Sequence, residues 1–114
     1  MVPEGLLRKA YVAFNARDVD GALALMHSDV AWPNGMEGGT VHGHDGVRAY
    51  WSRQWRIINP RVEPLRIVRE AEGLYVAQVH QVVKDLQGVV LTDRIVHPAY
   101  RLENGKVTSM EIRE

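Results

Sequence analysis

The sequence predicts an α+β domain in which three N-terminal helices are followed by a mostly antiparallel sheet. Apolar residues recur at helical spacing through the first half, whereas the second half consists of strand-like segments separated by glycine-containing turns. Helices followed by strands, rather than alternating with them, are typical of this class. No linker or internal repeat divides the chain, so we expect one domain over residues 1–114.

The first helix is predicted at residues 4–16, because Leu7, Tyr11 and Phe14 fall at i, i+4 and i+7 and form one apolar stripe. Asp18 is expected to cap a second helix, since its carboxylate can accept from backbone N–H groups of the first turn. The buried face of this second helix is expected to consist of Ala22, Leu25 and Met26.

A third helix is predicted at residues 45–58, with Asp45 as its cap. A short strand at residues 30–33 and a glycine-rich connection at 34–39, a possible lid, precede it. The apolar stripe of this helix contains Val47, Trp51, Trp55 and Ile58.

The remaining residues predict a meander of strands at 62–71, 74–86, 89–102 and 106–113. Turns are expected at Gly73, at Gly88 and at Asn104-Gly105. The last is the strongest hairpin signal, because Asn-Gly suits a turn in which both central residues have positive φ.

Composition excludes several classes of function. Fourteen basic and fourteen acidic residues cancel, so no positive field attracts nucleic acid or anionic lipid. No apolar run is long enough to span a membrane. The chain has no cysteine and its start lacks the pattern of a signal peptide, so we expect a cytoplasmic protein.

Four segments, in this order and spacing, resemble the nuclear transport factor two-like superfamily, which includes the SnoaL-like cyclases and the ketosteroid isomerases. They are residues 10–18 (AYVAFNARD), 25–30 (LMHSDV), 42–51 (HGHDGVRAYW) and 100–107 (YRLENGKV). The resemblance implies a cone-shaped α+β barrel in which a strongly curved sheet wraps the helices around a pocket. It also implies a homodimer formed through the outer face of the sheet. Members include isomerases, cyclases, epoxide hydrolases, dehydratases and non-catalytic binders, so the fold does not define the function.

Compared with the isomerases, Tyr11 lies where they carry their oxyanion-stabilising tyrosine. Trp32 occupies the position of their carboxylate base, and indole accepts no proton at neutral pH. His97 falls on the position of their protonated aspartate, unless Pro98 shifts the strand by one residue. A standard isomerase mechanism is therefore disfavoured. Epoxide hydrolysis is disfavoured as well, because the adjacent Asp93 and Arg94 point to opposite faces of a strand.

The remaining catalytic candidates are His80, Tyr11, Asp93 and His97. The resemblance to the isomerases places Gln78, His80 and Val82 on the pocket side, and alternation puts Asp93, Ile95 and His97 on one face. If both faces point inward, the histidines and Asp93 form an acid–base set. The alternative is that these residues are structural or lie on the dimer-facing side. The predicted ligand-binding residues are Phe14, Trp32, Met36, Trp51, Trp55, Gln78, Val82 and Tyr100, although Trp51 and Trp55 also suit plain packing.

The sequence predicts no cofactor and no metal, since His42 and His44 lack further ligands at suitable spacing. Three hypotheses follow. The first is acid–base catalysis on a small apolar, oxygenated molecule: isomerisation, dehydration, cyclisation or hydrolysis. The second is a non-catalytic binder of an apolar molecule. The third is a dimeric interaction module that pairs through the strand face carrying Gln81, Val83 and Asp85.

Overall fold

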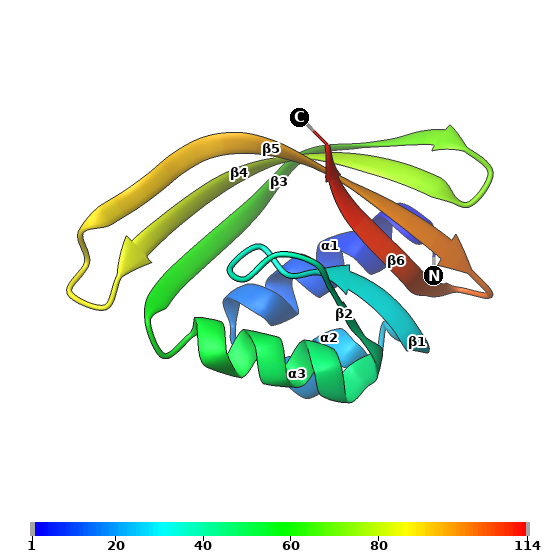
Figure 1. Ribbon diagram of the computed structural model, residues 1–114. Helices are drawn as coiled ribbons and strands as arrows, with labels where there is room; N and C mark the ends of the chain where they lie inside the picture. Colours follow the sequence, from blue (N-terminus) through cyan, green and yellow to red (C-terminus); the bar gives the residue numbers. More distant parts are fainter. Residues whose placement is uncertain (1, 114) are drawn as a thin grey trace.

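A computed structural model describes residues 2–113 and confirms the α+β class (Figure 1). Its helices are α1 (Pro3–Asn15), α2 (Val19–Leu23) and α3 (Gly43–Gln54). Its strands are β1 (Met26–Pro33), β2 (Thr40–His42), β3 (Ile58–Ala71), β4 (Leu74–Asp85), β5 (Val90–Glu103) and β6 (Lys106–Arg113).

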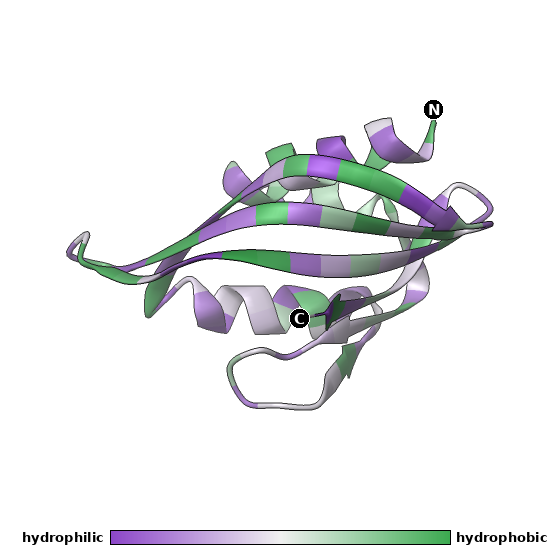
Figure 2. Ribbon diagram, turned by 90° about the horizontal axis from the view of Figure 1, so that it is seen from above, coloured by the Kyte–Doolittle hydropathy of each residue, from purple (hydrophilic) through white to green (hydrophobic). Residues whose placement is uncertain are grey.

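The six strands form one sheet in the order β2-β1-β6-β5-β4-β3. All neighbours are antiparallel except β1 and β6, which are parallel. The sheet arches over the three helices, which lie on its concave side (Figure 1). Seen from above, hydrophobic and hydrophilic segments alternate along the long strands (Figure 2), as expected when side chains point by turns to the two faces.

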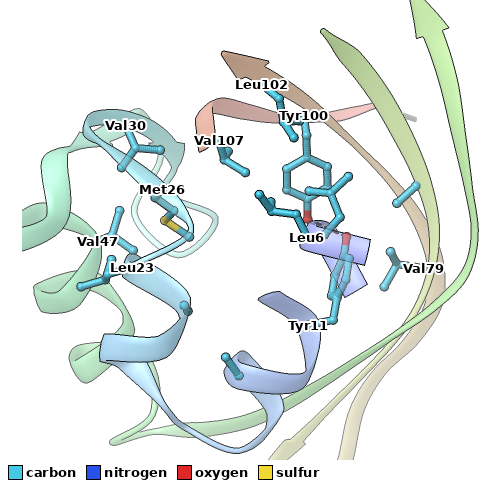
Figure 3. Packing of buried hydrophobic residues seen from close by; sticks show 14 of the residues in the cluster. Leu6, Tyr11, Leu23, Met26, Val30, Val47, Val79, Tyr100, Leu102 and Val107 are labelled. Carbon is cyan, nitrogen blue, oxygen red and sulfur yellow. Dashed lines mark hydrogen bonds between the residues drawn. The ribbon is translucent and has the colours of Figure 1, made fainter. Parts of the chain in front are cut away.

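The core joins helices and sheet on this concave side. The largest fully buried side chains come from five different elements: Leu7, Val30, Val47, Val79 and Val107. Figure 3 shows side chains of this cluster converging from the three helices and from strands β1, β4, β5 and β6. A fully buried Val or Leu stabilises a fold by about 1.5–3 kcal/mol relative to leaving it exposed. The helices are therefore held mainly by apolar contact with the sheet.

The hairpin predicted at Asn104-Gly105 is confirmed. Asn104 has φ 52° and Gly105 φ 75°, and Glu103 pairs with Lys106 across the turn. Two central residues with positive φ match the right-handed twist of the flanking strands. This turn fixes the register of β5 against β6.

The first helix was predicted almost to its bounds, whereas the elements after it differ. The second helix ends at Leu23, so Leu25 and Met26 do not form its face; Met26 instead begins β1 and pairs with Val107 of β6. The sequence pattern also missed β2. Backbone pairing with β6 and with β1 outweighs the local preference of these segments.

The third helix is shorter than predicted because Ile58 belongs to β3, where it pairs with Asp85. Asp45 is not its cap: the N-cap position is His42, and no side chain there accepts a hydrogen bond. The predicted cap of α2 is confirmed, since the Gly21 N–H donates to Asp18 Oδ1 at 3.0 Å. Within residues 2–113, no helix is long and apolar enough to cross a membrane.

Replacing Asp18 by Ala is expected to lower the free energy of unfolding by about 1 kcal/mol, because α2 loses its only side-chain cap. The matched control is Asp45→Ala, which removes a carboxylate from the first turn of α3 without breaking a cap and should cost only a few tenths of a kcal/mol. Urea unfolding of both variants measures the difference. Equal losses would contradict this assignment of the caps.

Candidate functional site

A cavity of about 350 Å³ lies between the concave face of the sheet and the helices. Its wall is mostly aliphatic and aromatic, as is usual for small-molecule sites. Five of the predicted binding residues line it: Phe14, Trp32, Met36, Trp51 and Tyr100. Trp55 is not part of the lining. It packs behind the wall, with its ring 5.5 Å from Phe14 and 5.7 Å from Trp51.

The aromatic part of the wall is a continuous set of ring contacts, two of them edge to face and the third tilted. The Phe14 and Trp51 ring centroids are 5.1 Å apart, Trp32 and Trp51 are 5.7 Å apart, and Trp32 and Tyr100 are 6.3 Å apart. Such contacts fix ring orientation beyond simple burial. Side chains of α1, β1, α3 and β5 therefore form one rigid surface that an apolar ring can pack against.

Tyr11 and Tyr100 place two hydroxyl groups in the cavity wall, with their oxygens 2.5 Å apart (Figure 3). Both residues are buried, and the two rings meet edge to face at 89°. Burial raises the pKa of both phenols, so both stay protonated at neutral pH. The pair holds two protons and uses one for its own hydrogen bond, which leaves one for donation to a ligand oxygen.

The glycine-rich loop between β1 and β2 is fastened to α3. The N–H groups of Met36 and Glu37 donate to Asn34 Oδ1 at 3.1 and 2.9 Å. The Gly35 N–H donates to the Tyr50 hydroxyl at 3.1 Å, and Arg53 donates to Glu37 at 2.9 Å. These bonds hold Met36 at the cavity and argue against the freely moving lid that the glycines suggested.

Three polar residues that sequence reasoning did not select for the pocket, Gln81, Thr92 and Arg94, line the cavity from the middle strands. Arg94 Nε donates to Gln81 Oε1 at 3.1 Å. Gln54 of α3 also lines the cavity, and its Oε1 is buried without a hydrogen-bond partner among the described residues. Together with the tyrosine pair and Tyr50, these residues provide the polar side chains of the lining.

The predicted inward orientation of Gln78, His80 and Val82 is wrong. In β4 the neighbouring residues Val79, Gln81 and Val83 line the cavity instead. His80 lies on the outer face, where Nε2 is 2.7 Å from Asp93 Oδ1 and both side chains are substantially exposed. The proposed pairing surface of Gln81 and Val83 is wrong for the same reason, since these two residues face inward.

Asp93, Ile95 and His97 do share one face, as predicted, but it is the outer one. The cavity receives Arg94, Val96 and Pro98 from this part of β5, so His97 lies one residue out of the register needed for an inward side chain. His97 lines a shallow depression on the outer face together with Gln78. Tyr11 is thus separated from His80, Asp93 and His97 by the sheet, and the four do not form one site.

The alternation of β4 contained the signal that decides between its faces. One set, Tyr75, Ala77, Val79, Gln81 and Val83, has a single strongly polar member, whereas the other, Val76, Gln78, His80, Val82 and Lys84, has three. Burial of apolar surface favours the first set on the concave side. The resemblance to the isomerases had suggested the second.

His42 is the last residue of β2, and His44 lies in the first turn of α3. His44 Nε2 lies 3.0 Å from the backbone oxygen of Met26, which ties the start of α3 to β1. Across the part of the chain that the structure describes, no group of three His, Cys, Asp or Glu residues is placed to hold a metal ion.

The sequence model of the SnoaL-like domain matches residues 7–110. Among solved structures, an NTF2-like protein of unknown function from Burkholderia pseudomallei is 30% identical, with a TM-score of 0.85 over 96% of this chain and 88% of that one. TerC, co-crystallised with polyporic acid, is 27% identical, with a TM-score of 0.84 over 96% and 88%. A Mycobacterium tuberculosis protein in complex with estradiol-17β-hemisuccinate shares the fold at 19% identity, with a TM-score of 0.81 over 96% and 90%. No curated protein matches the chain.

Tyr11→Phe and Tyr100→Phe are each expected to lower the free energy of unfolding by about 1–3 kcal/mol, because each leaves a buried hydroxyl without its partner. The double variant should lose less than the sum, since it leaves no orphaned hydroxyl. A double-mutant cycle from urea unfolding measures this coupling. Strict additivity would mean that the two hydroxyls do not interact in solution.

Proposed function

The chain belongs to the SnoaL-like family, and from this premise we propose that its cavity binds a small apolar molecule carrying at least one oxygen acceptor. The observation that supports this proposal most directly is the protonated Tyr11–Tyr100 pair in an otherwise mostly apolar wall. Apolar pockets gain affinity from buried area and orientation from a few polar groups. The solved structures with polyporic acid and estradiol-17β-hemisuccinate support the proposal, because they record organic molecules bound to proteins of this fold.

The tyrosine pair acts in this proposal as a hydrogen-bond donor. One hydroxyl donates to the other, and the second proton is directed to a ligand carbonyl or ether oxygen. Because burial raises the pKa of both hydroxyls, neither is present as the phenolate that could act as a base. The pair therefore orients and polarises a ligand oxygen and does not take a proton from the ligand.

Binding is better supported than acid–base catalysis. Among the described residues, no His, Asp or Glu lines the cavity, and these side chains are the usual proton acceptors near neutral pH. The candidate bases His80, Asp93 and His97 lie beyond the sheet. Catalysis by this cavity would therefore depend on polarisation by its hydrogen-bond donors, without a side chain of these types to take the proton, and we rank it second.

Binding of 2-acetylnaphthalene and of 2-ethylnaphthalene, measured by isothermal titration calorimetry, tests the proposal. The ketone should bind about tenfold more tightly than the hydrocarbon, because it accepts one hydrogen bond in an apolar wall. Tyr11→Phe/Tyr100→Phe should abolish that preference while both compounds still bind.

Two variants of α1, one at a cavity-lining position and one at an exposed position, test where the compounds bind. Ala10 lines the cavity, so Ala10→Phe fills it and should remove binding of both compounds. Val12 is exposed on the same helix, so Val12→Phe should leave binding unchanged. Failure of the wild type to bind either compound, or undiminished binding by Ala10→Phe, would reject the proposal.

We also propose that the outer face of the sheet pairs with a second copy of the chain. Ile95 is 45% exposed on this face, opposite His80, and Val68 is 42% exposed, opposite Val76. The His80–Asp93 pair lies among them and adds polar contacts that a symmetric partner can share.

Light scattering is expected to give about twice the monomer mass for the wild type, and the monomer mass for Ile95→Asp, because a buried unpaired carboxylate opposes association. Val90→Asp serves as the control, since Val90 is similarly exposed but lies at the far end of the hairpin. A monomeric wild type would contradict the pairing.

A further inference from the structure

Arg94 is the one charged side chain in the cavity lining among residues 2–113, and no carboxylate accompanies it there. Arg94 is exposed as well as part of the lining, so its guanidinium puts a positive charge on the part of the cavity wall that solvent reaches. Arg94 forms no salt bridge with any described residue. Its recorded hydrogen bond, from Nε to Gln81 Oε1 at 3.1 Å, goes to a neutral acceptor.

We propose that Arg94 makes the cavity selective for apolar ring molecules that carry an anionic oxygen group, a carboxylate or the anion of an acidic hydroxyl. This inference rests on the proposed binding function and names the class of ligand. The Tyr11–Tyr100 pair favours the same class, because it also offers a donor to a ligand oxygen. Gln54 Oε1 is the unpartnered acceptor of the lining among the described residues, and it suits one donor elsewhere on the same ligand.

The sheet positions the guanidinium for this task. Arg94 and Gln81 are direct cross-strand partners on the concave face, and Thr92 is the next inward residue of β5. Because Gln81 holds Nε, the edge formed by the two terminal nitrogens has no acceptor among the described residues. Two parallel N–H groups on such an edge match the two oxygens of a carboxylate.

Arg17 provides the contrast that separates an anion site from a structural arginine. Its guanidinium donates to Asn59 Oδ1 at 2.5 Å, to the Pro60 carbonyl at 2.8 Å and to the Phe14 carbonyl at 3.2 Å. It also lies 4.9 Å from the centre of the Trp55 ring. The oxygen partners accept three hydrogen bonds from its two terminal nitrogens, and Arg17 is not part of the lining. Arg94 has one partner and lines the cavity.

The spacing of the two donor sites sets the shape of the ligand. Tyr100 and Arg94 lie on the same face of β5, separated by the apolar Val96 and Pro98. Six residues of strand place their Cα atoms at most about 20 Å apart, and both side chains are long. A fused or linked ring system with an oxygen acceptor at one end and the anion at the other fits this arrangement.

Two fluorescent dyes that differ by one anionic group test the inference. They are 8-anilinonaphthalene-1-sulfonate and its neutral parent, N-phenyl-1-naphthylamine, titrated against the full chain. In Arg94→Gln, the dissociation constant of the sulfonate should rise about tenfold, the loss of one charge-assisted contact at a partly exposed site. The dissociation constant of the neutral dye should change by less than about twofold, because the substitution alters only the apolar contact made by one exposed side chain.

Arg101→Gln is the matched control, because Arg101 lies on the same strand with its side chain exposed and outside the lining. An equal loss of sulfonate binding in both variants would mean a general charge effect and overturn the inference, as would an equal loss of both dyes in Arg94→Gln. Sulfonate binding that persists in Ala10→Phe would place the anion elsewhere and overturn it too. If the neutral dye binds and Arg94→Gln changes the binding of neither dye, the inference is rejected but the proposed function stands. If the wild type binds neither dye, both are rejected.

Discussion

The two-residue alternation of β4 and β5 is the constraint on which the rest of the structure depends. Val79 and Val96 face each other across the ladder and are buried on the concave side. Once these two point inward, Gln81 and Arg94 must follow them and His80 must point outward, because successive side chains alternate between faces. A shift of one residue would exchange the contents of the cavity and of the outer face completely. The chemistry of the site is therefore decided by apolar burial at residues that carry no chemistry themselves.

The Tyr11–Tyr100 hydrogen bond depends on this same choice of face. It connects α1 with the middle of the sheet, between residues far apart in the chain. Each hydroxyl would be costly to bury alone, so each makes the burial of the other tolerable. The pair thus contributes to stability in the empty protein and offers a donor when a ligand enters. A group with both roles binds its ligand without first losing its own partner, because only one of its two protons is committed.

The sequence predicted the order of elements, the cap at Asp18 and the hairpin at Asn104-Gly105 because each depends on local geometry. It also identified most of the aromatic wall, since large apolar side chains at helical spacing are rarely left in water. The end of α2 and the short strand β2 depend on pairing partners distant in the chain, which no local pattern reveals. The face of β4 was predictable from the count of polar residues, but a family resemblance outweighed that count. Arg94 was not predicted as a ligand contact, because the face of β5 that carries Asp93 and His97 was expected to point inward, and this places Arg94 outside.

The neighbouring residues Asp93 and Arg94 have different kinds of hydrogen-bond partner on the two faces of the sheet. On the outer face, Asp93 meets His80 and the two polar groups satisfy each other. One residue further along β5, on the inner face, Arg94 meets an amide, which orients the guanidinium but leaves its charge in place. A glutamate at position 81 would form an ion pair there and cancel the field inside the cavity. The neutral partner keeps the cation both positioned and unneutralised, and this is the arrangement that an anion-binding group requires.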